Sequence, residues 1–147
     1  MRLFVALEPP AAVVADLPHR TGREHVTLAF LGEVDDPAPL LRALAAVARV
    51  PAPRVRLAGA GRFPGGAVWL GVHGDLTPVH TAVARALALP PGRSPWRPHL
   101  TIGRGAVPAW AVSYEGPEDL WRTVALVRST RSAGGVVHEA LGREELA

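Results

Sequence analysis

The sequence contains no cysteine, and this absence excludes disulfide bonds, thiol catalysis and zinc sites built on cysteine. Aromatic residues make up only 5% of the chain, and no apolar run approaches the roughly 18 residues that a membrane helix needs. The apolar run that follows Arg2 imitates a secretory signal but stops at Glu8, before a signal core could form. We therefore expect a cytoplasmic protein without membrane contact.

Lysine is also missing, so every basic side chain other than histidine is arginine. The guanidinium group never deprotonates in proteins, and it suits phosphate well. The formal net charge is nevertheless only +3, which is weak evidence for nucleic-acid binding. A biased composition explains the abundance of arginine better than a polyanionic partner does.

The balance of 48% hydrophobic and 20% charged residues is typical of a soluble globular protein. A length of 147 residues suits one domain with a real core and is too short for two ordinary domains. We therefore expect a single domain over residues 1–147. A monomer is favoured, although no pattern in the sequence fixes the oligomeric state.

Strand-like and helix-like segments are mixed along the chain. Short apolar or alternating runs predict strands, and apolar residues at helical spacing predict helices. This mixture indicates an α+β or α/β domain. The predicted strands are 2–7, 25–31, 54–60, 67–72, 99–104, 111–114, 123–127 and a last one near 136–140; the predicted helices are 11–17, 36–50 and one from Asp75 to about Leu87.

Two of the predicted strands carry the same motif, His-Φ-Thr-Φ, where Φ is apolar. The copies are HVTL at residues 25–28 and HLTI at residues 99–102. Because side chains alternate along a strand, the histidine and threonine of each copy share one face and the two apolar residues share the other. One copy in each half suggests an old duplication, in which two lobes face one another across a cleft.

A third His-x-Thr match, at residues 19–21, shows that the short pattern alone is not specific. Its middle residue is charged and it lies between Pro18 and Gly22, so we interpret it as a loop without a defined face. A single strand histidine beside a threonine is more often structural than catalytic. Two copies with apolar residues at all Φ positions instead favour a catalytic role for the two strand histidines.

The residue types suit in-line displacement at phosphorus, which needs a base for the attacking water and an acid for the departing oxygen. Histidine, with a pKa of about 6.5, can fill either role near neutral pH, so His25 and His99 are the candidate pair. The hydroxyls of Thr27 and Thr101 can donate to the non-bridging oxygens. A cyclic phosphate supplies its own strained leaving group, and the chain offers no compact cluster of metal ligands. We therefore expect no metal and no other cofactor.

The two motifs resemble the signature of the two-histidine phosphoesterase superfamily. Within it, the chain is most similar to the RNA 2′,3′-cyclic phosphodiesterase family, historically called 2′-5′ RNA ligases. The segments RLFVALEPP, HVTLAFLGEV, GRFPGGAVWLGV and WRPHLTIGR resemble blocks of that family, and the tail RSTRSAGGVVHEAL does so more loosely. The resemblance spans nearly the whole chain. It implies a bilobal, pseudo-symmetric α+β fold in which two antiparallel sheets flank a central cleft and helices lie outside.

The resemblance also implies roles for individual residues. His25 would be the general acid that protonates the leaving 3′ oxygen, and His99 the general base that activates water, so that an RNA end would keep a 2′-phosphate. Thr27 and Thr101 would hold the phosphate oxygens. Arg104 stands where the family often has arginine and would touch phosphate, although alternation along the strand places it with the core-facing residues.

Other functions stay open at this point. The substrates could instead be 2′-5′-linked oligonucleotides or a small cyclic nucleotide, and a non-catalytic module that binds RNA or nucleotides is a further alternative. In every case the expected partners are RNA ends or nucleotides. The segment before His25, PHRTGRE, is shorter than in the family, which leaves the preferred RNA open.

The remaining aromatic and histidine side chains rank lower as functional candidates. Phe4 and Trp96 could stack on a base, although core packing is the commoner fate of such residues. We interpret His73 and His80 as structural or exposed residues. His138 lies near the C-terminal tail and has no predicted role.

Overall fold

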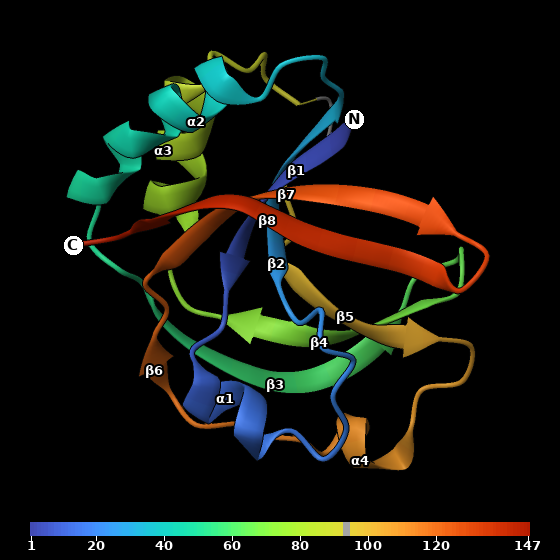
Figure 1. Cartoon of the computed structure of the whole chain (residues 1–147). Coiled ribbons are helices and arrows are strands. Elements are labelled where there is room, and N and C mark those ends of the chain that lie inside the picture. The colour runs from blue at the N-terminus through green and yellow to red at the C-terminus, as the bar shows by residue number, and fades with distance from the viewer. Residues whose placement is uncertain (93–94) are drawn as a thin grey trace.

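The computed structural model describes residues 1–92 and 95–147. In these ranges an antiparallel sheet of eight strands curls around the molecule (Figure 1). The strand order is β6-β3-β4-β5-β2-β1-β7-β8, and the α+β class predicted from the sequence is confirmed. The bounds are β1 Arg2–Glu8, β2 Val26–Glu33, β3 Arg54–Arg62, β4 Ala67–His73, β5 His99–Arg104, β6 Asp119–Leu120, β7 Thr123–Ser132 and β8 Gly135–Glu145.

Short helices lie at two ends of the sheet. In Figure 1, α2 and α3 lie together near the top left, and α1 and α4 lie below the sheet. Prolines precede or open these helices, where the missing backbone N–H costs nothing because the first turn has no acceptor for it. The bounds are α1 Ala11–Asp16, α2 Ala38–Leu44 with a 3₁₀ turn η1 at Ala45–Arg49, α3 Thr77–Ala86 and α4 Ala109–Val112.

One predicted strand is wrong, because residues 111–114 lie in α4 and the turn that follows it. Ala111 and Tyr114 are both buried, and a spacing of three places them on the same side of a helical turn. The Tyr114 hydroxyl donates a hydrogen bond to Asp16 at 2.7 Å, which ties α4 to α1. The short strand β6 has no counterpart among the predicted elements.

The two halves of the sheet meet between the two motif strands. Strands β8, β7, β1 and β2 form one half, and β5, β4, β3 and β6 form the other. Strands β2 and β5 are joined through the pair Val26 and Leu100. The two sheets that the resemblance implied are thus continuous, and the point where they join lies inside the two motifs.

The core covers both faces of β1. Its odd-numbered residues belong to the main core. The motif residues Val26, Leu28 and Leu100 belong to it too, as the alternation along the motif strands predicted. The same alternation predicts Phe30 in the core, which is wrong, because Phe30 is 77% exposed. The opposite face of β1 carries a smaller apolar cluster, which places Phe4 beside His25. This small cluster consists of Phe4, Ala6, Ala125 and Val127, with Ala140 packed against it.

None of the helices within the described ranges has the length and apolar character needed to cross a membrane.

Candidate active site

The two histidine motifs lie side by side at the centre of the sheet. His25 immediately precedes β2, and His99 is the first residue of β5. Their neighbours Val26 and Leu100 pair with each other and are fully buried. Continuing this antiparallel register by one residue in each direction brings His25 toward Thr101 and Thr27 toward His99.

The polar side chains of both motifs line one cleft of about 620 Å³. Because Val26 and Leu100 turn inward, the flanking histidines and threonines must emerge on the opposite face of their strands. The structure therefore brings together His25, Thr27, His99 and Thr101.

Backbone carbonyls fix the tautomer of both imidazoles. Nδ1 of His25 lies 2.7 Å from the carbonyl oxygen of Arg23, and Nδ1 of His99 lies 2.9 Å from that of Arg97. A carbonyl can only accept, so each Nδ1 carries a hydrogen and donates it. Both histidines thus donate the same kind of hydrogen bond, to the carbonyl of the residue two positions earlier. In each ring Nε2 remains available for proton transfer in the cleft.

Neighbouring side chains hold the two rings in place. The Oγ1 atom of Thr27 lies 3.1 Å from Nε2 of His25. Phe4 packs against His25, and Phe63 packs edge-on against His99, each with ring centroids 4.9 Å apart. Both imidazoles therefore have an aromatic wall on one side and the open cleft on another.

Burial lowers the pKa of His25 below its usual range, which favours the neutral imidazole. The hydrogen bond to the Arg23 carbonyl acts the other way, and so does the negative charge of Glu8, whereas the charge of His99 lowers the pKa further. Protonation of one imidazole therefore disfavours protonation of the other, so the two rings titrate as a coupled pair.

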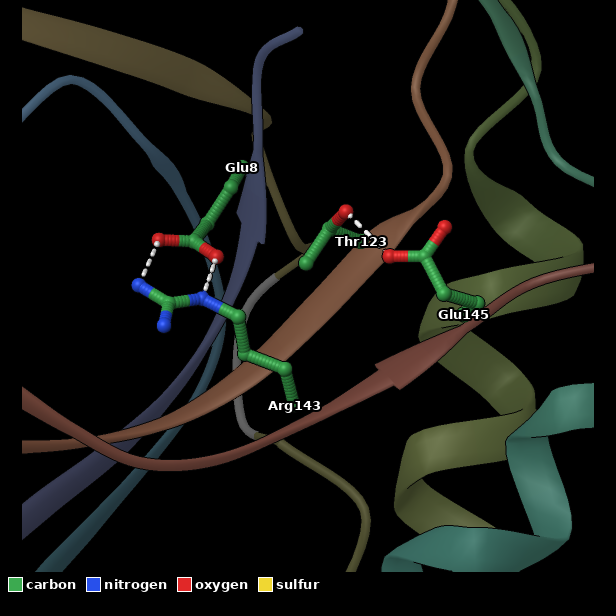
Figure 2. A network of polar contacts seen from close by, with 4 residues as sticks. All are labelled: Glu8, Thr123, Arg143 and Glu145. Atoms are coloured by element: carbon green, nitrogen blue, oxygen red, sulfur yellow. Dashed lines mark hydrogen bonds and ion pairs between the residues drawn. The ribbon is translucent and has the colours of Figure 1, made fainter.

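Arg143 binds the Glu8 carboxylate in a bidentate ion pair (Figure 2). The guanidinium Nε donates to one carboxylate oxygen at 2.7 Å and Nη2 to the other at 3.3 Å. Because β7 lies between β1 and β8, this pair spans β7, where Thr123 donates a separate hydrogen bond to Glu145 at 2.8 Å. The pair fixes the position of a negative charge that acts on His25.

His138 lines the cleft as well, although the sequence assigned it no role. Its ring lies edge-on to His25 and to Phe4, with centroids 5.5 Å and 5.0 Å apart. Burial lowers the pKa of His138, and the charges of His25 and Arg23 lower it further. The signal in the sequence was that Val136, His138 and Ala140 alternate on one face of a strand, but only the pairing of β8 with β7 brings that face to the cleft.

The candidate Arg104 and the third His-x-Thr match both lie outside the cleft. The guanidinium of Arg104 donates to the backbone carbonyl of Gly65, and Arg104 is not among the residues that line the cleft. His19, in the third His-x-Thr match, is exposed and also lies outside it.

Trp96 and two further histidines make contacts of a structural kind. The indole Nε1 of Trp96 donates to the carbonyl oxygen of Thr27 at 3.1 Å, and His80 stacks on the indole with centroids 4.1 Å apart. The Nε2 atom of His73 lies 3.1 Å from the carbonyl oxygen of Ala58. Trp96 thus braces the first motif strand from the side of α3.

No group of three or more histidine or carboxylate side chains in residues 1–92 and 95–147 is arranged to hold a metal ion.

Comparisons with known proteins agree with this fold. The family model of the 2′-5′ RNA ligase superfamily matches residues 10–132. TT0787 of Thermus thermophilus has 28% identity and a TM-score of 0.74, with 99% of this chain and 98% of that chain covered. Apo LigT of E. coli has 27% identity and a TM-score of 0.74, with 99% and 96% covered, and LigT was also solved with 3′-AMP, at a TM-score of 0.71. Among curated proteins, none matches the chain.

Proposed function

Because the chain belongs to the 2′-5′ RNA ligase superfamily, we propose that it is a phosphodiesterase that opens the 2′,3′-cyclic phosphate of RNA ends. The observation that carries the proposal is the paired geometry of His25 and His99. Two imidazoles with the same tautomer present Nε2 to one cleft from adjacent strands. This arrangement suits one phosphate between an acid and a base.

The proposed reaction is an in-line attack of water on the cyclic phosphorus. Nε2 of His99 accepts a proton from the water as the new O–P bond forms. The P–O3′ bond breaks, and the Nε2–H of His25 donates its proton to O3′, so that the phosphate stays on O2′. The hydroxyls of Thr27 and Thr101 donate to the non-bridging oxygens, where negative charge must be held through the transition state.

Binding of the substrate prepares His25 for its role as the acid. In the free protein the pKa of His25 is lowered, mainly by burial, so the ring is mostly neutral near pH 7. The cyclic phosphodiester is an anion, and an opposite charge within a few ångströms favours the imidazolium. We expect the bound substrate to raise the pKa of His25 and so to supply the protonated acid. E. coli LigT, a relative, was solved with 3′-AMP and with phosphate, which supports a cleft that accepts such groups.

The test is turnover of 2′,3′-cyclic nucleotides in the presence of a chelator. His25→Ala and His99→Ala should each lower kcat at least about 100-fold, because each residue transfers a proton in the transition state. Thr27→Val and Thr101→Val should cost less, because they remove one hydrogen bond each. His19→Ala, in the exposed third motif, is the matched control and should retain the wild-type rate.

Two results would contradict the proposal. One is an activity that is lost when the chelator is added. The other is a His25→Ala protein whose rate is close to that of the wild type. Parallel assays with 2′-5′-linked dinucleotides test whether these are the substrates instead. Tight nucleotide binding without turnover would favour a non-catalytic binding module.

A further inference from the structure

The residues that lead into His25 form a turn outside the sheet. Residues 18–24 belong to no helix or strand, and His25 lies just before the first residue of β2. Among the described residues, no backbone–backbone hydrogen bond reaches residues 18–24. The conformation and position of this turn therefore depend on hydrogen bonds that involve side chains.

The carboxylate of Glu24 determines the shape of the turn. The hydroxyl and the backbone N–H of Thr21 donate to it at 2.6 and 3.0 Å, and the backbone N–H of Gly22 donates at 3.1 Å. Burial acts to raise the pKa of Glu24, but these hydrogen bonds outweigh it and lower the pKa, so the carboxylate is charged near neutral pH. All of these bonds join residues of the turn to one another. They fix its shape and not its position beside the sheet.

Arg23 connects the turn to a distant strand. Its guanidinium Nη1 donates a hydrogen bond at 2.7 Å to the carbonyl oxygen of Val136, which lies 113 positions later in the sequence. Val136 is the second residue of β8. The backbone N–H of Arg23 also donates to Oγ1 of Thr21 at 3.0 Å, so the same residue is held within the turn. Arg23 thus joins the turn to the sheet.

Arg23 also supplies the acceptor that orients His25. Its carbonyl oxygen lies 2.7 Å from Nδ1 of the imidazole. Two positions after Val136, His138 packs its ring edge-on against His25, with centroids 5.5 Å apart. The strand β8 therefore contacts both Arg23 and the imidazole ring. A shift of the turn relative to β8 would displace the acceptor and the ring together.

The side chain of Arg23 is not placed to bind the phosphate between the two imidazoles. Arg23 is absent from the lining of the cleft and instead lines a separate cavity of about 120 Å³, which His25 and His138 also line. Burial is the main cause of the low pKa of His25; the Arg23 carbonyl raises this pKa and the Arg23 charge lowers it. Because the last two effects oppose each other, Arg23 influences His25 through geometry more than through charge.

We propose that Arg23 is a positioning residue for His25. Its hydrogen bond to β8 holds the turn in the place where its own carbonyl keeps the hydrogen on Nδ1 and directs Nε2 into the cleft. This inference rests on the proposed function, since His25 is the residue proposed as the general acid. Arg23 acts through His25 and does not touch the substrate.

The kinetic test compares Arg23→Met with the wild-type protein on 2′,3′-cyclic AMP. Methionine keeps an unbranched side chain but cannot donate to the Val136 carbonyl. We expect kcat to fall at least about tenfold, because a poorly oriented acid is less often in line with the leaving oxygen. KM should change by less than about twofold, because the residues that line the cleft are intact. Arg23→Lys keeps a donor and should recover part of the lost kcat.

Arg20→Met is the matched control for the kinetic test. It makes the same change in net charge three positions earlier, at an exposed residue that does not line the cleft, and should keep the wild-type kcat and KM. Arg23 is exposed as well, so all of these variants should fold, and circular dichroism at the assay temperature checks this.

A spectroscopic test measures the tautomer of His25 and needs no substrate. Nitrogen NMR above the pKa of His25 should place the hydrogen on Nδ1 in the wild-type protein. In Arg23→Met the hydrogen should be shared between Nδ1 and Nε2, because the carbonyl is no longer held in place. His99 should keep its tautomer in both proteins, since the Arg97 carbonyl serves it. This test holds even if cyclic AMP is not hydrolysed, a result that would refute the proposed function instead.

Three results would overturn the inference while leaving the proposed function intact. Arg23→Met could keep the wild-type kcat. Its kcat could fall while the His25 tautomer stays as in the wild-type protein, which would separate the loss from the orientation of the ring. Its KM could rise with kcat unchanged, which would mean that the guanidinium binds the substrate directly.

Discussion

Each candidate catalytic imidazole is held by the carbonyl oxygen of the residue two positions before it. Arg23 serves His25 in this way, and Arg97 serves His99. The sequence predicted the histidines and their threonines, because His-Φ-Thr-Φ can be read along a single strand. It did not predict the tautomers, because the conformation of the residues just before each strand determines which carbonyl lies within reach.

His25 should titrate below the usual histidine value of about 6.5 in the free protein, chiefly because burial disfavours its charged form. His99→Ala should raise this pKa, because it removes a nearby positive charge, whereas Glu8→Gln should lower it, because it removes a negative one. Inorganic phosphate should raise it. Histidine NMR signals followed over a pH series measure all three effects.

Glu145→Gln provides the control for the titration, because Glu145 bonds to Thr123 rather than to Arg143 (Figure 2) and has no part in the shift of His25. A His25 titration above the usual value would show that the cleft does not favour the neutral ring. If the pKa of His25 were the same in His99→Ala as in the wild-type protein, the charges of the two imidazoles would not interact.

At the scale of elements, the two strands that carry the histidine motifs were predicted correctly, because each has one clear apolar face. Residues 25–31 and 99–104 show this pattern, and both are strands in the structure apart from His25 itself. Residues 111–114 were also predicted as a strand, yet they lie in a helical turn and the residues that follow it, because Pro108 opens a helix and Tyr114 reaches Asp16 across the molecule. Contacts between distant segments overrode the local pattern.

Leu100 joins the halves of the sheet through its pairing with Val26, and it is fully buried. Leu100→Ala should lower the free energy of unfolding by about 2–5 kcal/mol, because it removes buried contacts and leaves a cavity. Chemical denaturation followed by circular dichroism measures the loss. Val112→Ala, at a side chain that is 64% exposed on α4, is the control and should change the free energy by less than about 0.5 kcal/mol. Equal stability of the two variants would mean that the junction contributes little.

At the scale of the whole molecule, the fold groups side chains that lie far apart in the sequence. The composition gave little support to nucleic-acid binding, since arginine is abundant throughout and the net charge is small. Arg2, Arg128 and Arg131 all line the cleft, from strands that are far apart in the sequence. The same folding brings His138 beside His25. Neither grouping could be predicted without the order of the strands.

The isomer of the product tests the proposed orientation of the substrate between His25 and His99 most directly. Water can expel either O2′ or O3′, and the two oxygens are chemically similar, so the choice depends on which of them faces the fixed acid. Phosphorus NMR of 2′,3′-cyclic AMP incubated with the protein and a chelator distinguishes the two monophosphates. We expect 2′-AMP to accumulate, and we expect no product with His25→Ala or His99→Ala on the same timescale. A predominantly 3′-AMP product would contradict this orientation, and an unchanged substrate would contradict the proposed activity itself.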